Sequence, residues 1–366
     1  MSKLADAVSR LALQPENPQH NVAVAEIYDE LGQTAAALSY YMRAAERTTD
    51  ADLSYACLIR SARCFERQNH RHVSVRTLLK RAIVLNPRRP EAYWYLARFN
   101  ETTSQYSDCY LLCRQAQEFC DWNAAPLPLS VSYPGAWAFD FERGVSAWWW
   151  GMNQECRDRL RDLVKHRWHD MDTQHRRGVA DNIRRIGDDK KFFEREYQAW
   201  CDTASDINEH LPTLLALAQQ CQHVTEMGVR TGASTRAFLA ADRVLRSYDL
   251  YLDDEVRAWF DLANLLGRDA VYTKADVLTI HIDETDLLFI DTLHNYDQLR
   301  QELTRHSSKV RRYMVFHDTE TFGWRDEIGT GPGLRQALDE FLAASSQWRL
   351  QHRYTNNNGL TVLERC

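Results

Sequence analysis

The segment HVTEMGVRTGAST, residues 223–235, decides the fold of the C-terminal half of this 366-residue chain. A short β-branched run leads into a turn with two glycines, and a helix-forming stretch follows at once. Gly228 and Gly232 allow the backbone to turn tightly and to approach a ligand without an intervening Cβ atom. The helix start at Ser234 and Thr235 offers free N–H groups to a carboxylate. The segment therefore predicts a strand, a ligand-binding turn and a helix in succession.

The same alternation continues to the C-terminus. Apolar runs predict further strands at 244–252, 269–275, 286–291, 312–318 and 359–365. Helix-like patterns occupy 206–221, 254–267, 296–307 and 333–344. Strands that alternate with helices indicate a mostly parallel sheet covered on both faces. Ligands of such sheets bind beyond the carboxyl ends of the strands, so the chemistry-bearing residues are expected there.

Acidic residues stand at the first three of these strand ends. Glu226 closes the first strand, and Asp249 follows 23 residues later at the end of the second. Nucleotide-binding sheets use an acid at about this spacing to bind ribose hydroxyls. Asp276 follows the third strand, where a carboxylate can accept a hydrogen bond from an adenine amino group. The ExGxxxG spacing lacks the central glycine of the dinucleotide motif, which favours a ligand without a pyrophosphate.

The next two strand ends carry acids and histidines together. Asp291 and His294 share one strand-to-helix turn, and His317 and Asp318 follow the fifth strand. If the two strands are neighbours, two carboxylates and two imidazoles converge. Such a group is either a divalent-metal site or an acid/base centre. The glycine- and aromatic-rich segment 319–333 beside it is a candidate lid.

The first two hundred residues predict a stack of helical hairpins. Tyr28, Gly32, Ala37, Tyr41 and Ala44 fall at the small and aromatic positions of a tetratricopeptide repeat. A second repeat ends in AIVLNP at 82–87 and a third begins at Pro90, so that Ala82 and Ala116 are one 34-residue period apart. A degenerate fourth unit is expected around Ala147, Gly151, Cys156 and Leu160, after the proline-rich segment 126–134 interrupts the stack. Stacks of this kind bind peptides or mediate assembly.

Composition narrows the classes of function. Residues 205–366 hold 17 Lys and Arg against 24 Asp and Glu, a net charge of −7, which disfavours a nucleic-acid substrate. The nine cysteines form no CxxC pair, so reduced and partly buried thiols are expected, without a zinc site. No apolar run is long enough to span a bilayer, and the N-terminus does not resemble a signal peptide, which predicts a cytoplasmic protein.

The motifs EMGVRTGAST, SYDL, LLFIDTLHNYDQL and VFHDT together resemble the class I S-adenosylmethionine-dependent methyltransferases. Within that superfamily the chain is similar to the group with cephalosporin-hydroxylase-like and macrolide-sugar O-methyltransferases. The resemblance covers Asp206 to Cys366, so the expected domains are a tetratricopeptide-like repeat domain at 1–200 and a methyltransferase domain at 206–366. It implies a Rossmann-like sheet of seven strands with an antiparallel last hairpin.

The resemblance also implies a cofactor site for S-adenosylmethionine. Glu226, Gly228 and Gly232 would cradle its methionine moiety, Asp249 its ribose and Asp276 its adenine. The expected cofactor-binding set is completed by other residues of the glycine turn and the helix start: Arg230, Ser234 and Thr235.

For catalysis, the resemblance assigns Asp291 and His294, with His294 as general base. The related sugar O-methyltransferases hold Mg²⁺ at the positions of Asp291, His317 and Asp318. This chain has His-Asp where those enzymes have two acids, and Mg²⁺ prefers oxygen ligands, so Mg²⁺, another divalent cation and a metal-free mechanism all stay open.

The sequence thus predicts O-methylation of a hydroxyl group on a sugar, a glycan or another small molecule, with the repeats as an interaction or assembly module. Two alternatives remain: a binding scaffold whose methyltransferase-like domain is inactive, and a methyltransferase that acts on protein.

Overall fold

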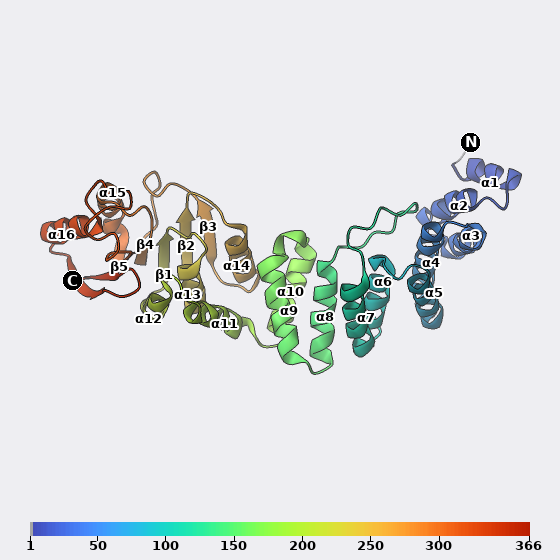
Figure 1. Cartoon of the computed structure of the whole chain (residues 1–366), viewed down its shortest axis with the longest axis horizontal. Helices are drawn as coiled ribbons and strands as arrows, with labels where there is room; N and C mark the ends of the chain where they lie inside the picture. The colour runs from blue at the N-terminus through green and yellow to red at the C-terminus, as the bar shows by residue number, and fades with distance from the viewer. Residues whose placement is uncertain (1–2) are drawn as a thin grey trace. The chain divides into compact units, whose positions relative to one another are not determined.

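The computed structural model describes residues 3–366 and forms two compact units, one up to Leu163 and one from Val164 to Cys366 (Figure 1). This boundary comes earlier in the chain than the one between the predicted domains, 1–200 and 206–366. The reason is that the helices after residue 164 pack onto the sheet unit. Trp168 Nε1 donates to Asp261 Oδ2 at 3.1 Å, and the ring of Phe192 lies 5.8 Å from that of Trp259.

The first unit is built from helices, and the first eight of them pack in turn against their neighbours along the chain. They are α1 (Lys3–Leu13), α2 (Pro18–Glu30), α3 (Thr34–Arg47), α4 (Ala51–Glu66), α5 (His72–Leu85), α6 (Pro90–Thr102), α7 (Tyr106–Phe119), α8 (Trp137–Trp149) and α9 (Asn153–His166). Side chains cap the N-termini of some of these helices. Asn17, for example, accepts hydrogen bonds from the backbone N–H groups of Gln19 and His20 at the start of α2.

The repeat positions pack as the spacing predicted. Ala37, Tyr41 and Ala44 of α3 are fully buried between α2 and α4, because small side chains let the helices approach. In the expected fourth repeat, Ala147 and Leu160 are also fully buried. The tetratricopeptide-like helical repeat is therefore confirmed as the fold of this half.

The second unit contains a seven-stranded sheet in the order β3-β2-β1-β4-β5-β7-β6. Its strands are β1 (His223–Met227), β2 (Val244–Asp249), β3 (Ala270–Lys274), β4 (Thr285–Ile290), β5 (Val310–His317), β6 (Trp348–Tyr354) and β7 (Leu360–Arg365). β1 to β5 are parallel, and β7 runs antiparallel to both β5 and β6. The predicted Rossmann-like sheet with an antiparallel last hairpin is therefore confirmed.

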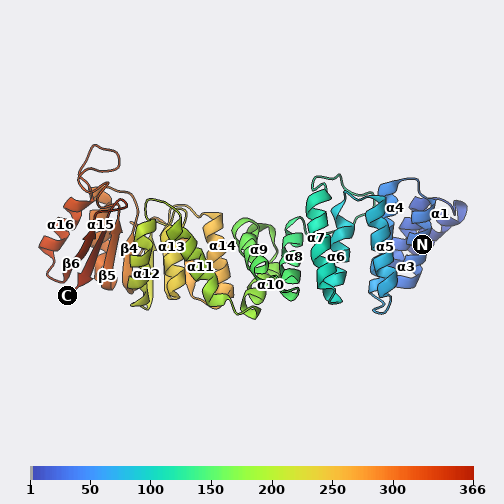
Figure 2. The same ribbon diagram turned by 60° about the horizontal axis from the view of Figure 1, so that its bottom comes forward.

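Helices cover both faces of this sheet (Figure 2). They are α12 (Leu211–Gln219), α13 (Ala233–Ala241), α14 (Asp254–Leu265), α15 (Tyr296–His306) and α16 (Leu334–Ala344). Two more helices pack on this layer: α10 (Thr173–Arg185) against α14 and α11 (Asp189–Asp202) against α13. Alternate residues of β4 serve the two faces: Leu288 packs in one cluster with Leu299 of α15 and Leu338 of α16, whereas the ring of Phe289 lies 5.7 Å from that of Phe238 in α13. Burial on both sides explains the continuous apolar run of this strand.

The sheet order places a switch point beside β1. The chain moves from β1 to β2 and β3 in one direction, then returns to add β4 on the other side of β1. The helices that follow β1 and β4 therefore lie on opposite faces of the sheet and leave a crevice at the carboxyl ends of these strands, where ligands of such sheets bind.

Within residues 3–366, no helix is both long and apolar enough to cross a membrane. All nine cysteines are free thiols, and six of them are buried inside the two units.

Candidate active site

Glu226 lies beneath the glycine turn. Its carboxylate accepts hydrogen bonds from the hydroxyls of Ser234 at 2.6 Å, Thr235 at 2.9 Å and Ser247 at 2.6 Å. Complete burial raises the pKa of Glu226 to about 7, against the opposing effect of these hydroxyl donors. The predicted residues Glu226, Ser234 and Thr235 are thus brought together, in a network that ties the start of α13 to β1 and β2.

The two glycines are required by the close approach of other parts of the chain. Gly228 has φ +83°, and a Cβ atom there would lie 1.9 Å from the carbonyl oxygen of Asp291. Gly232 has φ +77°, and its Cβ would lie 2.9 Å from Cγ2 of Val256. Gly228 therefore lets the turn after β1 lie directly against the turn after β4, which brings Asp291 to the crevice.

Asp249 orders the same turn from the end of β2. Its Oδ2 accepts from the backbone N–H of Val229 at 2.7 Å and of Arg230 at 3.0 Å. The guanidinium of Arg230 points elsewhere and pairs with Asp206 at 2.7 Å. Asp249 thus fixes the turn through one oxygen, while its carboxylate also borders the crevice.

The crevice contains a cavity of about 390 Å³, within the size range of small-molecule sites. Its wall is largely apolar, and carboxylates stand at its edge. The lining residues are Gly228, Tyr248, Asp249, Leu250, Tyr251, Ala275, Asp276, Val277, Leu278, Asp291, Thr292, Leu293 and Gln298. Four predicted site residues therefore meet here: Gly228, Asp249, Asp276 and Asp291. The remaining members of the predicted cofactor set are outside the lining: Glu226, Arg230, Gly232, Ser234 and Thr235.

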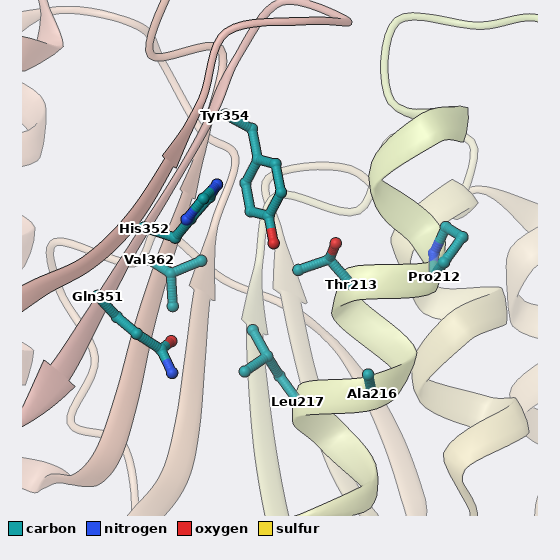
Figure 3. Close-up of a pocket in the computed structure, with 8 residues that line it drawn as sticks. All are labelled: Pro212, Thr213, Ala216, Leu217, Gln351, His352, Tyr354 and Val362. Atoms are coloured by element: carbon teal, nitrogen blue, oxygen red, sulfur yellow. The ribbon is translucent and has the colours of Figure 1, made fainter.

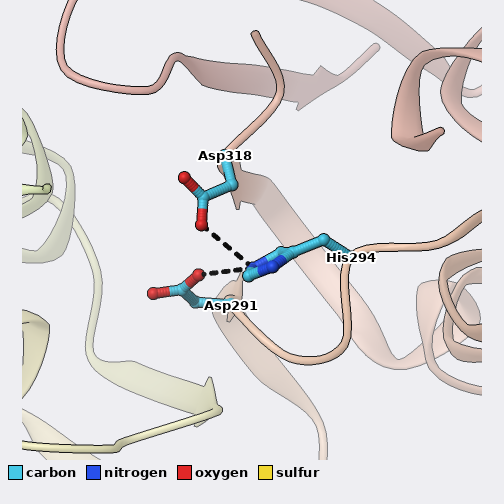
Figure 4. A group of neighbouring side chains, drawn as sticks. All are labelled: Asp291, His294 and Asp318. Carbon is cyan, nitrogen blue, oxygen red and sulfur yellow. Dashed lines mark hydrogen bonds and ion pairs between the residues drawn. The ribbon is translucent and has the colours of Figure 1, made fainter. Parts of the chain in front are cut away.

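Beside this cavity the turns after β4 and β5 bring two acids and a histidine together (Figure 4). His294 Nε2 lies 3.2 Å from Asp291 Oδ1 and 3.1 Å from Asp318 Oδ2. One ligand atom from each of these three residues lies within 4.8 Å of the others, a grouping that can hold a metal ion. His317 Nδ1 lies 3.3 Å from the same oxygen of Asp291. All four predicted residues therefore converge.

The outer nitrogens of both imidazoles face oxygen acceptors. His317 Nε2 lies 3.1 Å from the carbonyl oxygen of Asp206 and must donate to it, and His294 Nδ1 lies 3.1 Å from a carboxylate oxygen of Glu327. Metal-binding histidines have such outer partners, because these fix the ring and leave the inner nitrogen for the ion. Asp206 and Glu327 were not predicted as site residues.

Aromatic packing also fixes the His294 ring. Phe322 stacks on it, with ring centroids 4.9 Å apart and planes 6° apart. Phe322 and Glu327 both come from the predicted lid segment 319–333. That segment therefore contacts the site, while Trp324 and Ile328 expose most of their surface to solvent.

The cluster shifts the pKa values of its members in a consistent way. Burial disfavours charge on Asp291, but hydrogen bonds from His294 and His317 hold its pKa below the ordinary value. Burial likewise opposes charge on the two histidines, yet the neighbouring carboxylates raise their pKa values. Burial, together with the charge of Asp291, raises the pKa of Asp318. These interactions stabilise positive charge at the centre of the group, whether it is a proton or a cation.

The backbone of Asp318 has φ +60°, in the left-handed region that few side chains adopt. The residue is also 5% exposed, directly after the last residue of β5. This conformation accompanies the turn of its carboxylate toward His294, and strained conformations of this kind cluster at functional sites.

A second cavity of about 460 Å³ lies between α12 and the antiparallel hairpin (Figure 3). It is lined by Pro212, Thr213, Ala216, Leu217, Gln351, His352, Tyr354 and Val362. This lining has no carboxylate and none of the predicted site residues. The chemistry therefore belongs to the crevice at the strand ends.

No family model matches the chain, and no curated protein does. Among solved structures, an O-methyltransferase from Bacillus cereus in complex with SAH is 14% identical, with 49% of this chain and 90% of that chain covered and a TM-score of 0.35. A 1,6-didemethyltoxoflavin-N1-methyltransferase from Burkholderia thailandensis, with bound S-adenosylhomocysteine, is 16% identical over 53% of this chain and 91% of that chain, with a TM-score of 0.36. MamA is 14% identical over 43% of this chain and 81% of that chain, with a TM-score of 0.35.

The second unit has the strand order and the strand directions that the class I methyltransferase resemblance implied.

Proposed function

We propose that this protein is an S-adenosylmethionine-dependent methyltransferase that methylates a hydroxyl group on a sugar, a glycan or another small molecule. The proposal is based on one observation: Asp291 belongs to two groups of residues at once. This residue lines the cavity at the switch point and also belongs to the acid and histidine group. We infer that a cofactor site and a proton-accepting site share one wall.

We propose that the cavity holds the adenosyl group. Its apolar wall, with Tyr248 and Leu278, suits the faces of an adenine ring, and Asp276 stands at its edge to accept from the amino group. Asp249 would bind the ribose hydroxyls from the end of β2. We assign Gly228 to the methionine end, where its backbone meets the turn of Asp291.

The other predicted cofactor residues support this site indirectly. Glu226 accepts from Ser234 and Thr235, which fixes the helix start behind the turn. Gly232 permits the turn itself, and Arg230 anchors it to Asp206. We propose that these residues position the turn for the cofactor.

When bound, the cofactor would supply a methyl group on a sulfonium sulfur, which leaves as a neutral thioether. The protein must hold the acceptor hydroxyl in line and remove its proton. We propose that His294, in its neutral form, takes this proton at Nε2, which lies within 3.2 Å of carboxylate oxygens of both Asp291 and Asp318. Glu327 and Phe322 hold the imidazole in orientation.

As an alternative in which His294 does not take the proton, the donor set fits a divalent cation that accepts imidazole. Asp291, His294 and Asp318 offer three ligand atoms, and His317 stands next to them. Mg²⁺ prefers an all-oxygen set, whereas Zn²⁺ and Mn²⁺ accept mixed nitrogen and oxygen ligands. A bound cation would lower the pKa of an acceptor hydroxyl, as metals do for water.

For the repeats we propose an interaction or assembly role. Two alternatives make different predictions: an inactive domain binds no S-adenosylmethionine, and a protein methyltransferase transfers the methyl group to a polypeptide. The acidic balance of residues 205–366 favours a small neutral acceptor over nucleic acid.

The first experiment separates cofactor binding from transfer in the full chain. S-adenosylmethionine should bind in calorimetry, and Asp276→Ala should weaken binding at least about tenfold, as expected for a lost charge-assisted hydrogen bond. Asp269→Ala is the matched control, since this exposed acid lies at the opposite end of β3 and pairs with Arg246. The absence of binding heat with the wild-type chain would contradict the proposal.

The second arm tests His294. His294→Ala should retain cofactor binding but lose about 10²–10⁴-fold in methyl transfer from radiolabelled S-adenosylmethionine to a panel of sugars and small hydroxyl compounds. Transfer that goes instead to added protein would favour the protein-acceptor alternative. Full transfer by a folded His294→Ala chain would remove His294 from catalysis.

A further inference from the structure

The connection between α7 and α8 is much longer than its geometry requires. These helices pack directly against each other, and roughly 2–8 residues join such neighbours in most bundles. Here residues 120–136 intervene, with no helix or strand among them. Figures 1 and 2 show this segment leaving the α7–α8 pair and running along the repeats toward α4. Long connections without secondary structure in compact domains are usually functional.

The middle of this segment is an extended chain with one face on the repeats. Burial alternates residue by residue, which is the period of an extended backbone. The inward residues are Leu127, Leu129, Val131 and Tyr133, and the outward ones are Pro128, Ser130 and Ser132. Leu129 is 2% exposed and packs in one cluster with Val22 of α2, Tyr41 of α3 and Leu53 of α4.

Side chains of the repeats bind the backbone of the segment. Arg89 donates to the carbonyl of Ala125 at 2.9 Å, and Arg60 donates twice to that of Ser130, at 3.1 and 2.7 Å. Tyr95 donates to the carbonyl two residues farther on, at 2.7 Å. Contacts to main-chain oxygens recognise an extended backbone whatever its side chains. The segment is thus held in the way a bound peptide is held.

We propose that residues 124–133, the strap, occupy a peptide-binding groove of the repeats, and that a partner protein displaces the strap with an extended segment of its own. The partner segment carries apolar side chains at alternate positions, as Leu127, Leu129 and Val131 do. The inference rests on the interaction role proposed for the repeats and is independent of methyl transfer.

Two features make the strap displaceable. Its ends are fixed by the α7–α8 pair, so it can leave the groove while the helices stay packed. Pro126 and Pro128 also lack N–H groups and keep the chain extended, so the strap has no strand ladder to break. A tethered segment of this kind competes at a high effective concentration, which sets the affinity a partner must exceed.

The test uses the full chain and a labelled, end-capped peptide of residues 123–135 as the probe. In fluorescence anisotropy, the double variant Leu129→Asp, Val131→Asp should bind the probe at least about tenfold more tightly than wild type, because its own strap no longer competes. Adding Arg60→Ala and Tyr95→Phe to that variant should abolish the gain. Equal binding by wild type and the double variant, or no binding by a double variant with wild-type helix content, would overturn the proposal.

Limited proteolysis provides a second measurement that needs no variant. Excess unlabelled peptide should speed cleavage within 124–133 of the wild-type chain, by a protease that cuts beside Leu or Val, and leave α2 to α7 uncut. An unchanged rate of cleavage in the strap would make it a permanent part of the core and refute displacement. Peptide-sensitive dimers in sedimentation would identify a second copy of this chain as the occupant, which contradicts a partner protein. Neither readout involves methyl transfer, so failure of the methyltransferase proposal would leave both unaffected.

Discussion

At the scale of single residues, two carboxyl groups near the crevice behave in opposite ways. Asp291 has charged partners that hold its pKa down, while Glu302 of α15 has only neutral ones. Glu302 Oε1 accepts from Thr292 Oγ1 at 2.6 Å and from Gln298 Nε2 at 2.8 Å. Burial is the larger effect and raises the pKa of Glu302 to about 7. The charge on Glu302 is therefore a cost to the fold at neutral pH.

This cost has a definite pH window. Because the folded pKa lies above the unfolded value, the stability contributed by Glu302 is complete below about pH 4.5 and falls as the pH rises to about 7. Glu302→Gln removes the titration and keeps an acceptor for Thr292. We expect the variant to match wild type near pH 5 and to exceed it at pH 8 by up to about 3 kcal/mol.

Urea unfolding of the second unit at the two pH values measures this difference. A variant that differs from wild type by the same free energy at pH 5 and pH 8 would show that Glu302 does not titrate in this range.

At the scale of elements, the parallel pairing of β4 with β5 brings the two polar turns into one site. Ile290 pairs with Phe316, so the residues after each strand emerge side by side. Asp291 and Asp318 come from these two turns, and their separation along the chain is irrelevant to their contact. The sequence could anticipate this meeting, because the carboxyl ends of parallel neighbours share one edge of the sheet.

The composition of this cluster predicts its metal preference. We expect Zn²⁺ or Mn²⁺ to bind the full chain at least about tenfold more tightly than Mg²⁺, because imidazole nitrogen is a poor ligand for Mg²⁺. Calorimetry in two buffers measures both the affinity and the protons released by the ligands. His317→Gln should weaken Zn²⁺ binding, and His352→Gln, on the exposed β6, is the control. Equal affinity for Mg²⁺ and Zn²⁺ would contradict this assignment.

Other elements were harder to predict. β6, with the sequence WRLQHRY, has no apolar alternation, and most of its residues are exposed at the edge of the sheet. Its strand conformation depends on pairing with β7, whose first four residues are buried. The resemblance implied seven strands, but the residues of β6 alone gave no signal for it, since edge strands need no buried face.

At the scale of the whole molecule, the chain has two compact units, each with its own hydrophobic clusters. Units with separate cores unfold as separate cooperative transitions. We expect two transitions in calorimetric melting of the full chain, and S-adenosylmethionine should raise only that of Val164–Cys366. At about one hundred times the dissociation constant, the ligand adds about 2.7 kcal/mol to that unit.

Hydrogen exchange during the melt assigns each transition to its unit. A single transition that moves as a whole with ligand would mean that the two units unfold together, and a shift of the repeat transition alone would place the ligand outside the crevice.

The sequence by itself determined the features that short local patterns specify. Strand-to-helix alternation, the glycine turn at Gly228 and the acids at strand ends follow from patterns a few residues long, and the repeat spacing follows from small residues such as Ala37 and Ala44. Local patterns carry this information because backbone geometry and the burial of one face act over one or two turns of chain.

Only the tertiary structure decided which distant groups complete these patterns. The carbonyl that fixes His317 comes from Asp206, 111 residues earlier, and the carboxylate that fixes His294 comes from Glu327, 33 residues later. Leu129, in a segment that the sequence presented only as an interruption, returns to fill the groove of α2 to α4. Such contacts depend on the path of the whole chain, because any carbonyl or apolar side chain brought to the right place would serve equally well.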